Sequence, residues 1–120
     1  MMEHGLKGAK SIVTGAARGI GLGIAERFSE LGAEVVGWDL AGSDDPVFEA
    51  FFTCDVTSES SIEEAARASL AELGHGDILV NNAGINGPTK PTWDYTLDEW
   101  NRVLAVDLTG VFLSTRAVVR

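Results

Sequence analysis

The sequence has 120 residues, of which 45% are hydrophobic, and carries a formal net charge of −9. This length allows at most one domain, and the apolar content is ordinary for a globular protein. The negative charge argues against nucleic acid and against an anionic membrane as partners.

The few cysteines and histidines argue against a disulfide framework and against a metal site. Cys54 is the only cysteine, which favours a reducing cytoplasm. His4 and His75 are far apart in sequence, so no metal-ligand spacing appears. Residues 1–8 lack the apolar run of a signal peptide, and no segment has the length needed to span a bilayer.

The chain is expected to begin with a buried strand, a glycine-rich turn and a helix. Residues 10–14 are the strand and residues 14–21 the turn, and the helix extends from Ile20 to Leu31, with Gly32 as its C-terminal cap. The apolar stripe of this helix would consist of Ile20, Ile24, Ala25, Phe28 and Leu31.

Two further strands are expected at residues 34–39 and 50–54. The near-continuous apolar run of the first of them is typical of a parallel sheet that is covered on both faces. The connection between them, residues 40–50, is rich in turn residues and leaves room for about one helical turn.

The next two expected elements are a helix and a short strand. Thr57 or Ser58 is the expected N-cap of this helix, which ends near Gly74. The strand, residues 77–80, leads into a second polar turn, residues 81–84. The helix would bury Ile62, Ala65, Ala66, Leu70 and Leu73.

A long helix is expected after the loop that follows residues 81–84. Thr96 and Glu99 have the spacing of a capping box, and the helix should run from Leu97 toward the end of the chain. It is apolar on more than one face, which indicates burial between layers or against a partner.

This alternation predicts an α/β fold, a Rossmann-like doubly wound parallel sheet with strand order 3-2-1-4. Ligands of such sheets bind beyond the carboxyl ends of the strands, where the strand order reverses. The glycine turn, Asp39, Asp55 and residues 81–84 all follow strands, so they should converge on one crevice.

The glycine turn is interpreted as a cradle for a pyrophosphate. Gly15, Gly19 and Gly21 would let the backbone bend sharply and approach a ligand closely. The helix that follows presents unpaired N–H groups and a partial positive charge, which suits a phosphate. The alternative is a merely tight connection, but the position between a strand and a helix favours phosphate binding.

Asp39, 18 residues after Gly21, predicts which nucleotide binds. A carboxylate at the end of this strand can accept hydrogen bonds from both ribose hydroxyls of an adenosine, although it could also be a solvated turn residue. It would repel a 2′-phosphate, so NAD is favoured over NADP. Arg18 argues the other way, because a guanidinium could pair with that phosphate.

Three more polar residues at strand ends have two interpretations each. Asp55 could accept a hydrogen bond from an adenine amino group, or it could simply lead into the next helix. Asn81 and Asn82 could bridge neighbouring strands, contact the cofactor, or do both.

Other reactive side chains are expected to have structural roles. Cys54 should be a small buried residue and not a nucleophile. Trp93 and Tyr95 should belong to a lid or to the core, because no lysine follows Tyr95 at helical spacing to lower its pKa. His75, between two glycines, should be solvated.

These motifs together resemble the short-chain dehydrogenase/reductase family, from Leu6 to Val119. The resemblance implies hydride transfer between a nicotinamide and a carbonyl or alcohol carbon. It implies that the pyrophosphate is held by Gly15, Ala17, Arg18, Gly19, Ile20 and Gly21. It implies that Asp39 binds the adenosine ribose and that Asp55 and Val56 bind the adenine. It implies that residues 81–84, which are Asn81, Asn82, Ala83 and Gly84, contact the adenosine side of the cofactor.

The resemblance also implies which functional residues lie elsewhere. The family uses a serine and a Tyr-x-x-x-Lys motif beyond the long helix, and this sequence stops at Arg120. Residues 1–120 are therefore expected to be the cofactor-binding part, inactive alone. Asp107 stands where the family usually has an asparagine that supports a water near the lysine. Aspartate is nearly isosteric and could still hold a helix kink or a water, but it adds a negative charge.

The resulting expectation is an NAD-preferring oxidoreductase that interconverts a secondary alcohol and a ketone. It would be cytoplasmic, act on a small molecule and form a homo-oligomer through the long helix. One alternative is a complete, non-catalytic dinucleotide-binding or sensing module, and another is an interaction protein that keeps the fold as a scaffold. An unpaired edge at the fourth strand and exposed apolar residues on the long helix are expected aggregation hazards.

Overall fold

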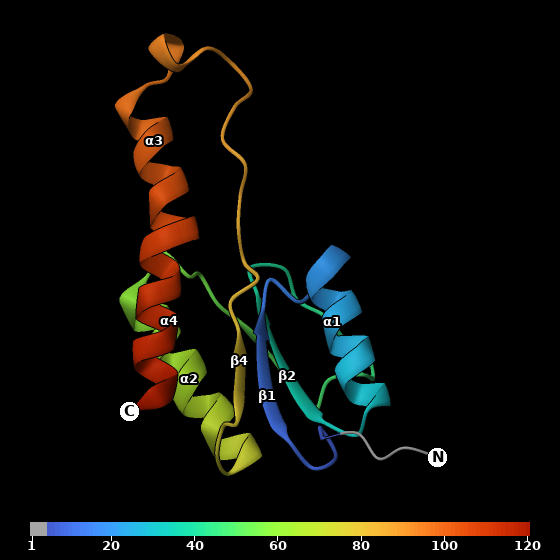
Figure 1. The fold of residues 1–120 in the computed structure, drawn as a ribbon. Coiled ribbons are helices and arrows are strands. Elements are labelled where there is room, and N and C mark those ends of the chain that lie inside the picture. Colours follow the sequence, from blue (N-terminus) through green and yellow to red (C-terminus); the bar gives the residue numbers. More distant parts are fainter. Residues whose placement is uncertain (1–4) are drawn as a thin grey trace.

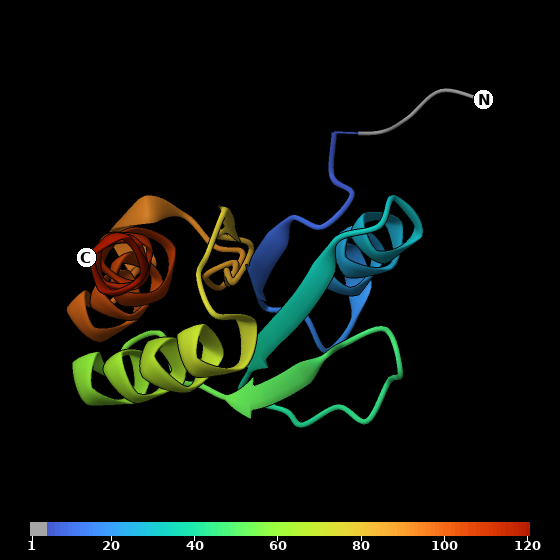
Figure 2. The ribbon, with the colours of Figure 1, turned by 90° about the horizontal axis from the view of Figure 1, so that it is seen from below.

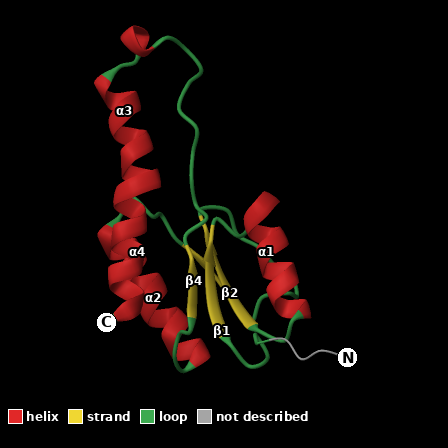
Figure 3. Ribbon diagram, viewed as in Figure 1, coloured by secondary structure: helices red, strands yellow, loops and turns green. Residues whose placement is uncertain are grey.

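A computed structural model describes residues 5–120, so His4 and the first half of the segment 1–8 lie outside the described part of the chain. Four strands and four α-helices follow one another along it (Figures 1 and 3). Their order is β1 (Lys10–Thr14), α1 (Gly19–Glu30), β2 (Glu34–Asp39), β3 (Ala50–Thr53), α2 (Glu59–Leu73), β4 (Ile78–Val80), a 3₁₀ turn (Thr92–Asp94), α3 (Leu97–Leu104), a π-helical segment (Ala105–Thr109) and α4 (Gly110–Val119).

The strands form one parallel sheet with the predicted order, β3-β2-β1-β4. Thr14 pairs with Trp38, Val13 with Val80, and Asp39 with Thr53. All four carboxyl ends therefore lie at the same edge of the sheet. β4 is the outer strand on its side, so the expected unpaired edge is confirmed within the described residues.

Helices cover both faces of the sheet, with α1 on one face and α2 and α4 on the other (Figure 2). Successive strand residues point to opposite faces, because the side-chain period of a strand is two. Ile12 accordingly packs in the core beneath α2 and α4, and its neighbour Val13 packs in the core beneath α1. This arrangement explains the continuous apolar run of the strands.

Trp38 is the largest fully buried side chain and links the sheet to α2. Its indole Nε1–H donates to the hydroxyl of Ser69 at 2.7 Å, inside the core. A buried indole N–H needs such a partner to offset the loss of water. Of the stripe predicted for this helix, Ile62, Ala65, Ala66 and Leu73 are buried, and Leu70 is half-buried.

The connection from β2 to β3 contains turns and no helix among the described residues, and the side chains of Ser43 and Asp45 accept hydrogen bonds from nearby backbone N–H groups there. One local expectation is wrong, since Ile20 is 77% exposed and does not join the buried stripe of α1. It lies in the first turn of α1, which begins beyond the carboxyl ends of the strands (Figure 1), so no strand covers it.

The long helix is continuous, but its middle segment, Ala105–Thr109, is π-helical and not α-helical. The capping box at Thr96 and Glu99 is present, and the π-helical segment joins α3 to α4 without a break in the helical backbone. Its two-sided apolar pattern is confirmed, since Leu113 packs against the core whereas Trp100 and Phe112 are more than half exposed. None of the helices among residues 5–120 combines the length and apolar character that crossing a bilayer requires.

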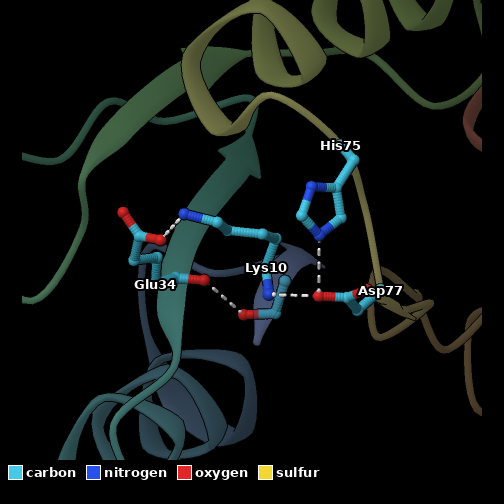
Figure 4. A network of polar contacts seen from close by, with 5 residues as sticks. Lys10, Glu34, His75 and Asp77 are labelled. Atoms are coloured by element: carbon cyan, nitrogen blue, oxygen red, sulfur yellow. Dashed lines mark hydrogen bonds and ion pairs between the residues drawn. The ribbon is translucent and has the colours of Figure 1, made fainter. Parts of the chain in front are cut away.

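A polar network ties the amino ends of β1, β2 and β4 together, at the edge opposite to the predicted crevice (Figure 4). Asp77 Oδ2 accepts a hydrogen bond from the Lys10 backbone N–H at 2.9 Å and lies 3.2 Å from Nε2 of His75. The Lys10 side chain forms an ion pair with Glu34. His75 is exposed, as expected, although it has this acidic neighbour.

The Asp77 contact predicts an acid-sensitive contribution to stability. The hydrogen bond from the Lys10 backbone N–H lowers the pKa of Asp77 below its ordinary value of 3.8. A lowered folded-state pKa stabilises the fold above the unfolded-state value, and the contribution is lost as the pH falls through the folded-state value. We expect Asp77→Asn to be less stable than the unsubstituted chain at neutral pH, with the difference closing as the pH falls through the lowered pKa of Asp77. Urea unfolding midpoints across this range measure it, and a constant difference at all pH values would contradict it.

Candidate dinucleotide-binding site

A cavity of ≈ 550 Å³ lies at the carboxyl ends of the strands. This volume is within the usual range for small-molecule sites. The predicted residues that line it are Gly15, Arg18, Gly19, Asp39, Asp55, Val56, Asn82, Ala83 and Gly84. It is also lined by Trp38, Leu40, Cys54, Thr57, Ile85, Arg102 and Val106.

A side chain in the glycine turn would clash with its neighbours at Gly21 but not at Gly19. A Cβ at Gly21 would lie 2.1 Å from the carbonyl oxygen of Gly15, so only glycine fits there. Gly19 has a φ of +59°, which strongly favours glycine, and a Cβ there would meet nothing within 4 Å. The turn is therefore closed toward β4 and open at Gly19, where α1 begins.

Thr14 and Asn82 join the turns after β1 and β4. The Thr14 hydroxyl oxygen accepts hydrogen bonds from the backbone N–H groups of Asn82 at 3.0 Å and Ala83 at 2.9 Å. The Asn82 side chain donates to the carbonyl oxygen of Gly15 at 3.1 Å. These bonds satisfy polar backbone groups of the turn after β4, and they fix one wall of the cavity against another.

Asp39 is held by the backbone on both carboxylate oxygens. Oδ2 accepts from the N–H of Ala17 at 3.0 Å, and Oδ1 accepts from the N–H of Ala41 at 3.1 Å. The carboxylate is therefore fixed beside the glycine turn and lines the cavity. A group that donates two hydrogen bonds could use the remaining lone pairs of the two oxygens.

Asp55 combines both of the positions considered for it, since it leads into α2 and also lines the cavity. Its Oδ1 accepts from the hydroxyl of Thr57 at 2.6 Å and from the N–H of Thr57 at 2.9 Å, and these bonds lower the pKa of Asp55. The N-cap of α2 is Ser58, whose side chain accepts from the N–H of Ser61. Asp55 therefore carries its negative charge at neutral pH.

Cys54 is buried, as expected, but it follows the last residue of β3 and does not belong to the strand, in contrast to the predicted bounds of 50–54. Burial raises the pKa of its thiol to about 11. The thiol is therefore protonated at neutral pH and unsuited to act as a nucleophile.

Asp107 lies in the π-helical segment and reaches back to the turn after β4. Its Oδ1 accepts from the backbone N–H of Ile85 at 2.8 Å. Single π-helical turns inside α-helices are frequent at functional sites, because they redirect side chains. This contact fixes the wall of the cavity that Gly84 and Ile85 form.

The contact of Asp107 predicts different effects for two substitutions. Asp107→Asn keeps an oxygen acceptor for the Ile85 N–H, so we expect a change in stability below about 0.5 kcal/mol. Asp107→Ala removes the acceptor and should cost about 1 kcal/mol. Amide hydrogen exchange at Ile85 should accelerate in Asp107→Ala and stay unchanged in Asp107→Asn. Equal exchange in both variants would show that the hydrogen bond does not hold this turn.

Several predicted site residues do not line the cavity. Ala17 and Ile20 belong to the glycine turn and to the start of α1, where their backbone N–H groups lie. The side chain of Asn81 donates to the hydroxyl of Thr115 on α4 at 3.2 Å instead. Gly21 and Asp107 support the cavity from behind, through the contacts described above.

The structure adds cavity residues that the sequence pattern did not indicate. Leu40 directly follows Asp39, so its position could have been inferred from its neighbour. Arg102 and Val106 come from the long helix, and only the packing of that helix brings them to the cavity. Trp93 is 85% exposed, so it belongs to no core within the described residues, and the Tyr95 hydroxyl donates to the Pro88 carbonyl within the loop.

Comparison with known proteins identifies the family. Residues 15–120 match the family model described as enoyl-(acyl carrier protein) reductase. The chain is 37% identical over 118 residues to 2-dehydro-3-deoxy-L-rhamnonate dehydrogenase (NAD(+)) of Sphingomonas sp. (strain SKA58), covering 93% of this chain and 47% of that protein. It is 37% identical to D-threitol dehydrogenase of Mycolicibacterium smegmatis, covering 94% of this chain and 47% of that protein.

Solved structures agree with the fold and with the strand order. The structure of 3-ketoacyl-(acyl-carrier-protein) reductase from Brucella melitensis, complexed with NADH, matches with a TM-score of 0.89 and 34% identity. The match covers 95% of this chain and 50% of that one. The chain thus spans about half the length of the relatives that it matches. Because the family model matches most of its residues, the chain belongs to the short-chain dehydrogenase/reductase family of oxidoreductases.

Proposed function

We propose that this chain is the NAD-binding part of an oxidoreductase that interconverts a secondary alcohol and a ketone. The observation that carries the proposal is the position of Asp39. Its carboxylate lies in the cavity and is hydrogen-bonded to the glycine turn, so a ribose binding site and a phosphate cradle adjoin each other. When bound, NAD would supply the hydride acceptor or donor.

Each part of the cavity suits one part of a dinucleotide. The open glycine turn and the first N–H groups of α1, around Gly19 and Ile20, would bind the pyrophosphate. Asp39 would accept hydrogen bonds from the ribose hydroxyls, and Asp55 and Val56 would face the adenine. Ala83 and Gly84 would contact the adenosine side, with Asn81 as a support for this turn.

NAD is proposed as the preferred cofactor over NADP. Asp39 would lie next to the ribose 2′ position, where its charge would repel a 2′-phosphate. Arg18 also lines the cavity and could offset part of this repulsion. We expect the carboxylate to dominate, because two backbone hydrogen bonds fix it whereas the Arg18 side chain is exposed.

Fluorescence titration of the 120-residue chain tests this proposal. Trp38 is buried and lines the cavity, so NADH should quench its emission. Trp93 and Trp100 are exposed, and replacing both with phenylalanine isolates the signal of Trp38. NADH should bind at least tenfold more tightly than NADPH. Absence of saturable NADH binding by a folded chain would refute the proposal.

Turnover is proposed to need residues that are not among these 120. The only tyrosine is Tyr95, and the residue four positions later is Glu99, not lysine. An unperturbed phenol with a pKa near 10 is a poor base at neutral pH. The chain should therefore bind NADH without oxidising secondary alcohols in the presence of NAD⁺. Formation of NADH by the purified chain would contradict this part.

The assembled protein is proposed to be a cytoplasmic homo-oligomer in which the long helix is covered. The helix exposes Trp100, Leu108, Phe112 and Val119, each more than half accessible. Exposed apolar patches of this kind mark interaction surfaces or aggregation hazards. A single buried thiol, Cys54, is consistent with a reducing compartment. Size-exclusion chromatography with light scattering measures the oligomeric state.

A further inference from the structure

Arg102 is an arginine of the cavity that forms no ion pair with another side chain of residues 5–120. Arg27, Arg116 and Arg120 each pair with a glutamate, whereas Arg18, Arg67 and Arg102 do not. Of these three, Arg18 and Arg102 line the same cavity, and Arg67 lines a different pocket. Arg18 belongs to the glycine turn, so its position there is explained by the sequence motif, but that of Arg102 is not.

Compensation of a helix dipole does not explain why an arginine occupies position 102. A basic residue in the last turn of a helix can interact with unpaired carbonyl groups at the helix end. Arg102 is in the last turn of α3, but the backbone remains helical at Leu104, with φ −63° and ψ −38°, and at Ala105, with φ −61° and ψ −41°. The helix continues through the π-helical segment into α4, so no helix end is present at this point.

The position of Arg102 places it at the side of the cavity away from α1. Arg102 and Val106 are four residues apart on one helix face, and both line the cavity. This helix lies on the face of the sheet opposite to α1 (Figure 2). Gly110, about two turns further along, packs closely on the carbonyl oxygen of Val56. Arg102 therefore lines the cavity from the helix that packs on Val56, on the side away from α1, and not from the glycine turn.

The chemistry of this side suits a flat aromatic base. Val56, Val106 and Leu40 supply apolar surface, and Asp55 supplies a hydrogen-bond acceptor. A planar guanidinium stacks favourably on an aromatic face, and arginine does so on nucleic acid bases. We propose that the Arg102 guanidinium stacks on the adenine of the dinucleotide and closes that end of the cavity. This inference rests on the proposed NAD binding.

Titration of three variants with NADH and with ADP-ribose tests the stacking role. Arg102→Ala should weaken the binding of both ligands by the same factor, about three- to tenfold. Arg102→Lys keeps the charge but loses the planar group, so it should resemble Arg102→Ala. Arg67→Ala is the matched control, because Arg67 is also exposed and unpaired among the described residues but lines a different pocket, and it should leave binding unchanged.

Other outcomes would overturn the inference. Unchanged NADH affinity in Arg102→Ala would show that the side chain does not touch the ligand. Full affinity in Arg102→Lys, with a steeper salt dependence than in Arg102→Ala, would indicate attraction of a phosphate instead. A loss for NADH but not for ADP-ribose would place Arg102 at the nicotinamide. If the unsubstituted chain bound no NADH, the proposed function itself would fail first. Thermal unfolding monitored by circular dichroism verifies that each variant is folded.

Discussion

Asp39→Ala should weaken NADH binding by about ten- to hundredfold. Hydrogen bonds to a charged group contribute about 1.5–3 kcal/mol, and each factor of ten corresponds to about 1.4 kcal/mol. The variant removes the acceptor for the ribose hydroxyls, and it also frees the backbone N–H groups of Ala17 and Ala41. Calorimetric or fluorescence titration measures the loss.

Asp39→Asn separates the charge from the hydrogen bonds. The amide oxygen can still accept from one backbone N–H, but the repulsion of a 2′-phosphate is removed. The preference for NADH over NADPH should therefore fall about tenfold or more. Asp44→Ala is the matched control, since Asp44 is an exposed acid in the same connection and outside the cavity lining. An unchanged preference in Asp39→Asn would mean that another group sets cofactor choice.

Gly21→Ala should cause the largest loss of stability. The new methyl group would lie 2.1 Å from the Gly15 carbonyl oxygen and 2.6 Å from Asn82 Nδ2. No flexible side chain can yield at the first contact, so the turn itself must open. We expect a loss of about 3 kcal/mol or more in the free energy of unfolding, together with loss of NADH binding. Urea unfolding and NADH titration measure the two effects.

Gly23→Ala is a sharp control for this prediction. Gly23 lies in the same helix, is exposed, and a Cβ there would meet nothing within 4 Å. Alanine is a better helix former than glycine, so this variant should gain about 0.5–1 kcal/mol and retain NADH binding. Equal stability of the two variants would show that crowding at the turn is not what requires glycine at position 21.

Most of the fold could be predicted from the sequence because its signals are local. β1 and β2 have the predicted bounds, and each helix has its expected cap or glycine stop close by. The parallel order β3-β2-β1-β4 follows from alternating strands and helices with right-handed crossovers. The error at Ile20 has a tertiary cause, since periodicity marks the apolar face of a helix but not where the sheet beneath it ends.

Like the fold, the candidate site could be predicted from the sequence only where its signals are local. The sequence by itself determined the glycine turn, Asp39 and Asp55, because strand ends of a parallel sheet meet at one edge. Only the tertiary structure decided that the Thr14 hydroxyl joins two turns, that Asp107 holds Ile85, and that Arg102 reaches the cavity. These contacts join residues far apart in sequence, so no local periodicity encodes them. The Thr14 contact depends on the pairing of β1 with β4, and the positions of Asp107 and Arg102 depend on how the long helix packs beside the sheet.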